Sequence, residues 1–74
     1  MLPYGGRIEA WIAAREEVFR QIRPYEAGRL IYHKGAPSEG VTKRHLWKLR
    51  DRLRRIDSHV PADWMATLTN AEGR

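Results

Sequence analysis

Residues 41–55, VTKRHLWKLRDRLRR, contain the strongest structural signal in the chain and determine how the rest is interpreted. Apolar residues recur there at intervals of three and four, the spacing of one face of an α-helix. At about 100° of rotation per residue, they fall within a sector roughly 80° wide. These apolar positions are Leu46, Leu49 and Leu53, together with Ile56 directly after the segment. The segment therefore predicts an amphipathic helix from about 43 to 56, capped at its N-terminus by the side chain of Thr42.

The polar surface of this helix is nearly uniform in charge, since seven of the fifteen residues are Lys or Arg and one is acidic. Like charges one turn apart repel, so such a sequence is expected to meet negative charge on a partner. A merely solvated face is the alternative, but a face of that kind commonly mixes both signs. Trp47 lies among the cations, far from the leucine stripe. Its indole either covers the edge of the core or anchors a partner, as Trp and Arg do at interfaces.

The bulk composition describes one small basic domain, residues 1–74. The net charge is +5, the pI is about 10.2, and residues 26–55 hold nine Lys or Arg against three acids. Such a patch attracts polyanions: nucleic acid, anionic lipid or an acidic protein face. The absence of cysteine excludes disulfides and thiolate metal sites and favours a cytoplasmic location. The sequence shows neither a membrane-spanning apolar run nor a signal peptide.

The N-terminal half predicts a second amphipathic helix, residues 7–22. Its apolar stripe consists of Ile8, Trp11, Ile12, Val18, Phe19 and Ile22. Arg15 interrupts this stripe, and its aliphatic stem is suited to lie along the apolar surface. Pro24 is expected to end the helix, because the residue before a proline avoids the α region. Residues 25–34, YEAGRLIYHK, favour a short helix with a short strand as the alternative, and residues 35–40, GAPSEG, have the composition of a loop.

The two ends of the chain complete this plan. Residues 1–6 are expected to form a flexible arm, and residues 69–74 a frayed tail. Pro61 is well placed as the first residue of a last helix, residues 61–68. The side chains expected to face inward from it are Trp64, Met65 and Leu68. The expected fold is therefore all-α, a small bundle of three to four short helices.

The segment EGVTKRHLWKL, residues 39–49, resembles the turn and recognition helix of helix-turn-helix DNA-binding proteins. In that family a glycine makes the left-handed turn, a small aliphatic residue follows, and Ser or Thr caps the second helix. Apolar residues four and seven positions after the cap face the first helix. The matching residues are Gly40, Val41, Thr42, Leu46 and Leu49. The resemblance implies a helix-turn-helix-like unit whose first helix spans residues 26–33, joined by a lengthened turn.

The same resemblance implies a small basic transcriptional regulator that binds duplex DNA through the helix at about 43–56. Its first residues would face the major groove, where Arg and Lys meet guanine edges or phosphates. The candidate contact residues are Thr42, Lys43, Arg44, Trp47, Lys48, Arg50, Arg54 and Arg55. About five phosphate contacts would give a log–log salt slope of roughly −4 to −5. Homodimerisation would serve specificity, through the stripe of the N-terminal helix or an exposed Trp11.

A protein-binding regulator is the second hypothesis. In size and character alone, the chain looks like the small phage-encoded regulators that bind a host RNA polymerase or another host enzyme. The same basic face would then meet an acidic protein surface, with Trp47 filling a pocket and the arm ordering on binding. A membrane partner is not expected, because the apolar stripe is needed for the core.

No constellation of residues points to catalysis. The three histidines, His33, His45 and His59, lack metal-ligand spacing, and there is no cysteine to join them. The serines are not arranged with a base and an orienting group, and the glycines match no phosphate-binding or dinucleotide motif. The chain is expected to be neither an enzyme nor a holder of a metal or cofactor.

Overall fold

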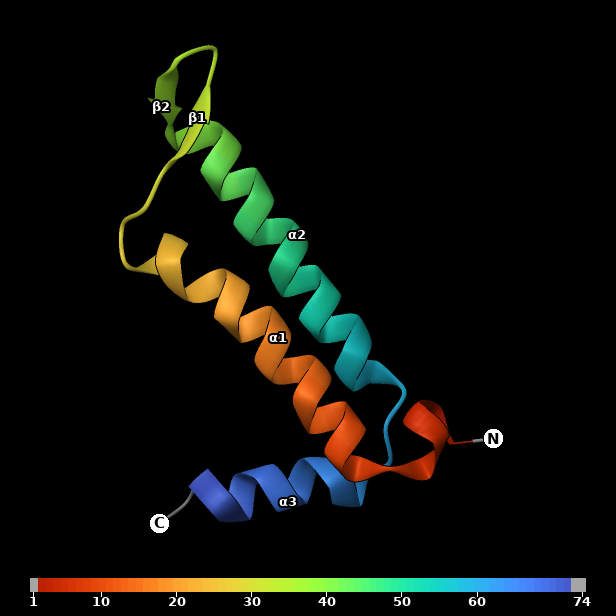
Figure 1. Ribbon diagram of the computed structural model, residues 1–74. Coiled ribbons are helices and arrows are strands. Elements are labelled where there is room, and N and C mark those ends of the chain that lie inside the picture. The colour runs from red at the N-terminus through yellow and green to blue at the C-terminus, as the bar shows by residue number, and fades with distance from the viewer. Residues whose placement is uncertain (1, 73–74) are drawn as a thin grey trace.

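The computed structural model of the protein describes residues 2–72 and is mostly helical (Figure 1). Three helices and one two-stranded antiparallel sheet follow each other along the chain, after a short 3-10 turn. The elements are η1 (Pro3–Gly6), α1 (Ile8–Glu26), β1 (Ile31–His33), β2 (Ala36–Ser38), α2 (Glu39–Ser58) and α3 (Ala62–Glu72). The expectation of a purely all-α fold is therefore wrong in one respect, because a small β-hairpin lies between the two long helices.

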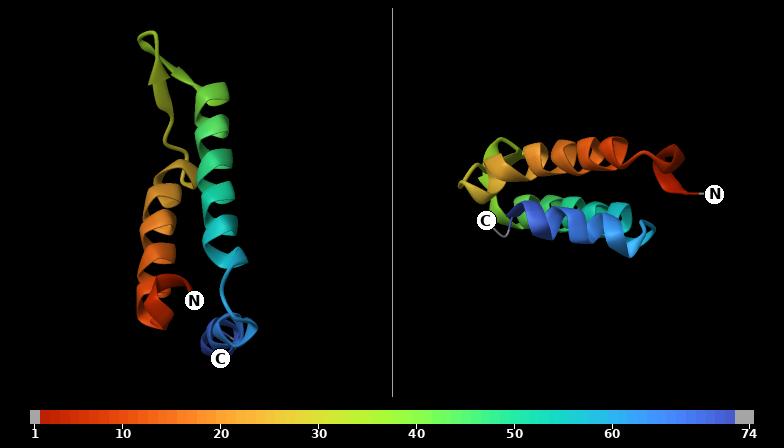
Figure 2. Two further views of the ribbon diagram at one scale, coloured as in Figure 1. Left: turned by 90° about the vertical axis from the view of Figure 1, so that its right-hand side faces the viewer. Right: turned by 90° about the horizontal axis from the view of Figure 1, so that it is seen from below.

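Helices α1 and α2 run side by side in opposite directions and enclose the core between them (Figures 1 and 2). Val18 and Ile22 of α1 and Leu49 of α2 are buried there. Four half-buried side chains pack against this cluster: Tyr25, Leu46, Leu53 and Ile56. The leucine stripe predicted for the basic segment is thereby confirmed. Burial of each large aliphatic side chain contributes about 1.5–3 kcal/mol, so this single seam holds the two helices together.

A second, more polar packing centre joins all three helices at the base of the molecule. Trp11 of α1 is fully buried, and its ring centroid lies 5.7 Å from that of Trp64 in α3. Its Nε1 donates a hydrogen bond of 3.1 Å to Asp57 near the end of α2. Arg15 forms an ion pair with the same carboxylate and lies over the Trp11 ring at 5.3 Å. The guanidinium group of Arg15 thus lies against two aromatic side chains of the α1 stripe, Trp11 and Phe19.

This packing centre corrects two expectations. A dimer contact through an exposed Trp11 is ruled out, because Trp11 is 0% exposed and is covered within its own chain. Val18 and Ile22 of the α1 stripe are also buried within the chain, against Leu49 of α2. Met65 was expected to face inward with Trp64, but its side chain is 38% exposed because α3 crosses the end of the helix pair and contributes mainly Trp64.

Pro24 does not end α1 as predicted, because the helix continues to Glu26. The extra turn is stabilised by tertiary packing, since Tyr25 lies against the core cluster and makes an edge-on contact with His45, with ring centroids 5.2 Å apart. The helix ends where Gly28 takes a φ of +108°, and the N–H groups of residues 27–29 bond back to carbonyls of the last turn.

The short helix favoured for residues 25–34 is not formed, and the alternative, a short strand, is correct. Residues 31–33 pair with 36–38 in the register Ile31↔Ser38 and His33↔Ala36. Lys34 and Gly35 form the two-residue turn between them, with φ values of +54° and +82°. Two consecutive positive φ angles are the signature of a type I′ turn, whose twist matches that of the flanking strands. The expected loop at 35–40 is thus a turn residue, a strand and the start of α2.

Helix α2 starts four residues earlier than predicted and ends at Ser58. Its cap is Ser38, whose Oγ accepts a hydrogen bond from the N–H of Val41, so the prediction that Thr42 caps the helix is wrong. Gly40 lies within the first turn of the helix and does not take a positive φ. The element before the basic helix is the hairpin, and residues 26–33 contain no helix beyond the last residue of α1. A helix-turn-helix unit is therefore not confirmed.

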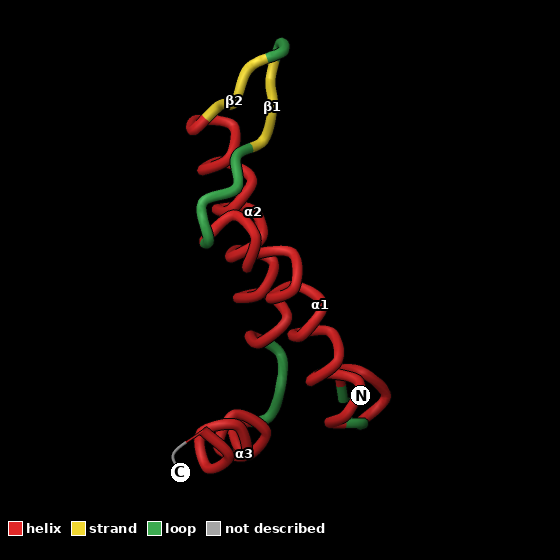
Figure 3. The backbone as a smooth tube through the Cα atoms, turned by 60° about the vertical axis from the view of Figure 1, so that its left-hand side comes forward, coloured by secondary structure: helices red, strands yellow, loops and turns green. Residues whose placement is uncertain are grey.

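The molecule is flat and extended, measuring 45 × 31 × 15 Å. Its radius of gyration is 15.2 Å, compared with about 11 Å for a compact domain of this length. The hairpin projects beyond one end of α2, and α3 lies at the other end (Figure 3). Helix α3 continues to Glu72, so residues 69–72 of the expected frayed tail are helical, while residues 73–74 lie outside the described range. In a single layer of two helices, each helix keeps one side open to solvent.

Candidate functional site

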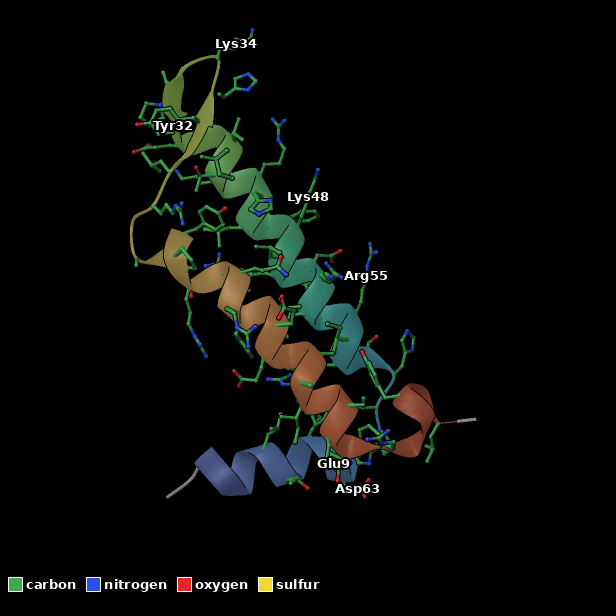
Figure 4. All side chains as sticks on the ribbon, in the orientation of Figure 1. Glu9, Tyr32, Lys34, Lys48, Arg55 and Asp63 are labelled. Carbon is green, nitrogen blue, oxygen red and sulfur yellow. The ribbon has the colours of Figure 1, made fainter. Side chains whose placement is uncertain are left out.

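The open side of α2, opposite the leucine stripe, is the candidate interface. In Figures 1 and 2, α1 covers one side of α2, and α3 lies beyond its C-terminal end. Figure 4 shows Lys48 and Arg55 projecting from the side of α2 that faces away from α1. By helical rotation, the outward residues from Lys43 to Arg55 cover roughly half of the circumference of α2. The predicted cationic face therefore exists as one continuous, convex surface about 18 Å long, at 1.5 Å per residue.

Four cations on this face have no ion-pair partner among the described residues. They are Lys43, Arg44, Lys48 and Arg52, and all four are exposed. Three of them lie in the first half of α2, within six positions of one another. Their charges are not compensated inside the chain, so the field they create is directed outward. An anionic partner is therefore expected to bind most strongly at the N-terminal half of α2.

The other three cations of the predicted site are tied to carboxylates of the same chain. Asp51 lies 3.0 Å from Arg55 and 3.9 Å from Arg54, measured between nitrogen and oxygen atoms. Arg50 reaches across to Glu26 at the end of α1, at 3.0 Å. These arginines remain largely exposed, and exposed pairs of this kind contribute only about 0–1 kcal/mol. They can therefore exchange their partner for a stronger anion at little cost.

Trp47 stands at the centre of the face, and its side chain is 64% exposed. The sequence left two roles for Trp47, to cover the edge of the core or to anchor a partner. Its exposure excludes the first role. Its neighbours one helical turn away are Lys43 and Arg44 before it, and Arg50 and Asp51 after it. An exposed indole surrounded by cations is a combination typical of protein interfaces, where Trp and Arg are enriched among the residues that contribute most to binding.

Thr42 is the one predicted contact residue that the structure removes from the site. It is 4% exposed and sits between α2 and the hairpin. Its Oγ1 accepts a hydrogen bond of 2.8 Å from the N–H of Ile31 and donates one of 2.6 Å to the carbonyl of Ser38. The sequence suggested an exposed cap because the hairpin that covers Thr42 was not foreseen. The role of Thr42 is structural, since it fastens both strands to the first turn of α2.

Sequence reasoning missed Tyr32 and Lys34 of the hairpin as candidate surface residues. Tyr32 is 71% exposed, and Lys34 is exposed at the tip of the type I′ turn. Arg52 was also left out of the predicted contact set. The signal available in the sequence was the Lys-Gly pair between two short extended runs, LIYH and APS, because glycine in such a pair favours a two-residue hairpin turn.

The described residues contain no pocket, and no group of three His, Cys, Asp or Glu side chains there could hold a metal ion. None of the described helices combines the length and the apolar character needed to cross a bilayer. The chemistry that the α2 face offers is the donation of charged hydrogen bonds from guanidinium and ammonium groups, beside one large aromatic ring. No protein-family model, curated protein or solved structure matches the chain.

Proposed function

We propose that the chain is a small transcriptional regulator that binds duplex DNA, with the open face of α2 as its contact surface. The observation that carries this proposal is the set of four unpaired cations on one continuous helix face, three of them around the N-terminal half of α2. An α-helix with its side chains is about 10–12 Å in diameter and fits a major groove about 12 Å wide. Charge and shape therefore agree on the same partner.

The arrangement also sets the expected strength of the interaction. Each phosphate neutralised by a cation contributes about −0.9 to the slope of log K against log salt. The four unpaired cations, Lys43, Arg44, Lys48 and Arg52, would together give a slope of about −3.6. Between roughly 50 and 200 mM salt, this slope corresponds to a loss of affinity of about 150-fold. The paired arginines would add to the slope only if they left their carboxylates.

The proposal is tested with a fluorescein-labelled duplex of random sequence, followed by anisotropy across that range of salt. A duplex of roughly 20 base pairs, at 3.4 Å per pair, exceeds the 45 Å length of the protein. The wild type should bind with a slope at least as steep as the one given above, because the four α2 cations set its minimum. Lys43→Ala should bind about eightfold more weakly at 0.1 M salt and make the slope about 0.9 less negative, because one phosphate contact is lost.

Arg20→Gln is the matched control, since Arg20 is an exposed cation on α1, is paired with Glu17, and lies outside the candidate face. It lowers the net charge by the same amount as Lys43→Ala and should leave the slope unchanged. Equal effects of the two substitutions would mean that binding follows the total charge and not the α2 face. A wild-type protein that leaves the duplex free at 50 mM salt would refute duplex binding altogether.

A second candidate function is supported by Trp47. A side chain that is 64% exposed at the centre of the face suits an apolar pocket on a protein better than a DNA groove. In this alternative the chain binds an acidic protein surface, such as that of RNA polymerase, and inhibits or modifies it. Truncation of a Trp anchor at an interface typically costs 2 kcal/mol or more, which is roughly 30-fold in affinity.

The two functions are separated by comparing Trp47→Ala with Lys43→Ala. Because Trp47 is 64% exposed and is not among the side chains packed on the core cluster, its truncation should change the free energy of unfolding by less than about 0.5 kcal/mol. If the chain regulates transcription by binding a protein, purified RNA polymerase should form a complex with the wild type that is lost with Trp47→Ala. Tight polymerase binding together with absent duplex binding would decide for this candidate. Duplex binding that is weakened by Lys43→Ala and left unchanged by Trp47→Ala would decide against it.

A further inference from the structure

The hairpin is held in a defined position against the first turn of α2 by hydrogen bonds. The buried Thr42 is hydrogen-bonded to both strands, through the N–H of Ile31 and the carbonyl of Ser38. The Ser38 side chain in turn caps α2 through the N–H of Val41. The position of the hairpin relative to the helix is therefore set by three partly buried hydrogen bonds, whose loss costs more than that of a fully exposed bond.

The tip of the hairpin presents a lysine at a position where lysine is not the natural choice. Lys34 has a φ of +54°, in the left-handed region, which a residue with a Cβ enters only at a cost. The first position of a type I′ turn is preferentially Asn, Asp or Gly. Folding alone would thus be served better by one of those residues. A lysine there points to a use for the ammonium group itself.

Lys34 also continues the basic face of α2. Figure 4 shows Lys34 at the hairpin tip on the same side of the molecule as Lys48 and Arg55, whereas Tyr32 projects from the other side. Lys34 is exposed and has no ion-pair partner among residues 2–68. The unpaired cations therefore continue from the N-terminal half of α2 onto the tip of the hairpin, beyond the first residue of the helix.

We propose that the hairpin is a second contact to the same duplex DNA, with the Lys34 ammonium bound to a backbone phosphate beyond the end of α2. This inference rests on the proposed duplex binding and deepens it. The occupant fits by charge, because duplex DNA presents a phosphate about every 1.7 Å along its axis and therefore meets a row of cations along its length. The contact positions the protein and carries no sequence information. Lys34 raises the total of unpaired contacts to five and the expected salt slope to about −4.5.

The test uses Lys34→Asn, because asparagine keeps or improves the type I′ turn while removing the charge. In the anisotropy titration with the random duplex, the slope should become about 0.9 less negative, and affinity at 0.1 M salt should fall about eightfold. Lys34→Arg, which retains the charge, should restore both values. Arg20→Gln again controls for net charge and should leave both unchanged.

The failure of this inference is distinct from the failure of duplex binding. If Lys43→Ala weakens binding while Lys34→Asn keeps the wild-type slope and affinity, the hairpin is no contact and the α2 interface stands. If the wild type does not bind the duplex at 50 mM salt, both are overturned together. A loss with Lys34→Asn that Lys34→Arg does not repair would also overturn the inference, because the effect would then arise from the turn.

Discussion

Replacement of Asp57 by alanine should be among the most destabilising single changes on the polar side of the core. The carboxylate holds two partners, the indole Nε1 of Trp11 and the guanidinium of Arg15. The side chains of Arg15 and Asp57 are only 14% and 22% exposed, so water replaces the lost contacts poorly. Asp57→Ala leaves a nearly buried cation without its counter-ion and a fully buried indole without an acceptor.

The size of the effect follows from this geometry. Removing one partner of a buried ion pair costs about 3–5 kcal/mol, and the lower end applies because both groups keep an edge in water. A chain of 74 residues has a total stability of about 4–11 kcal/mol, so a loss of about 3 kcal/mol is a large share of it. With an unfolding entropy of about 2.1 cal/mol/K per residue, the melting temperature should fall by about 19 °C.

Urea denaturation followed by circular dichroism measures this loss, and three variants show its origin. Asp57→Asn keeps an oxygen acceptor for Trp11 and loses only the charge, so it should cost about 1–2 kcal/mol. Adding Arg15→Met to Asp57→Asn should cost little more, because the unpaired cation has been removed as well. Glu17→Ala, which breaks an exposed pair with Arg20, should stay within about 1 kcal/mol of wild type. If Asp57→Ala were as mild as Glu17→Ala, the idea of a buried ionic lock would be untenable.

Three further changes test other parts of the fold. Thr42→Val should lower stability by about 2 kcal/mol and speed hydrogen exchange at the Ile31 amide, because both hydrogen bonds of Oγ1 are lost; an unchanged Ile31 exchange rate would contradict this. Trp64→Ala should cost about 3–5 kcal/mol and shift tryptophan fluorescence to the red, since Trp11 loses its cover. Gly35→Ala should cost about 1 kcal/mol in a thermal melt, because φ is +82° while no atom lies within 4 Å of an added Cβ; a stabilised variant would argue against the turn geometry.

The sequence alone was sufficient for features that depend on local periodicity. The apolar stripes of α1 and α2 follow from the spacing of residues such as Val18, Ile22 and Leu49, because each side chain's direction on a helix is fixed by its position. The concentration of cations on the outward side of α2 follows from the same arithmetic. Trp64 was also placed correctly in the core, as a large apolar residue in a short terminal helix.

Only the tertiary structure decided the features that depend on which elements meet. Arg15 and Asp57 are 42 residues apart in the chain, and nothing local in either segment indicates their pairing. Pro24 remained inside α1 because Tyr25 gains packing against α2, which outweighs the local preference of the residue before a proline. Residues 31–33 became a strand because a type I′ turn returns the chain upon itself and Thr42 receives the Ile31 N–H.

The candidate site shows the same division. Its composition was readable from residues 41–55, because charge and helical phase are properties of the sequence itself. The set of residues in the site could not be read in the same way. Thr42 is buried because the hairpin covers it, and Lys34 is part of the surface because the turn places it at the hairpin tip. Trp47 is 64% exposed because none of the described elements packs over that side of a layer two helices wide. Periodicity therefore fixes which way a side chain points along its own helix, whereas burial depends on what packs against that side.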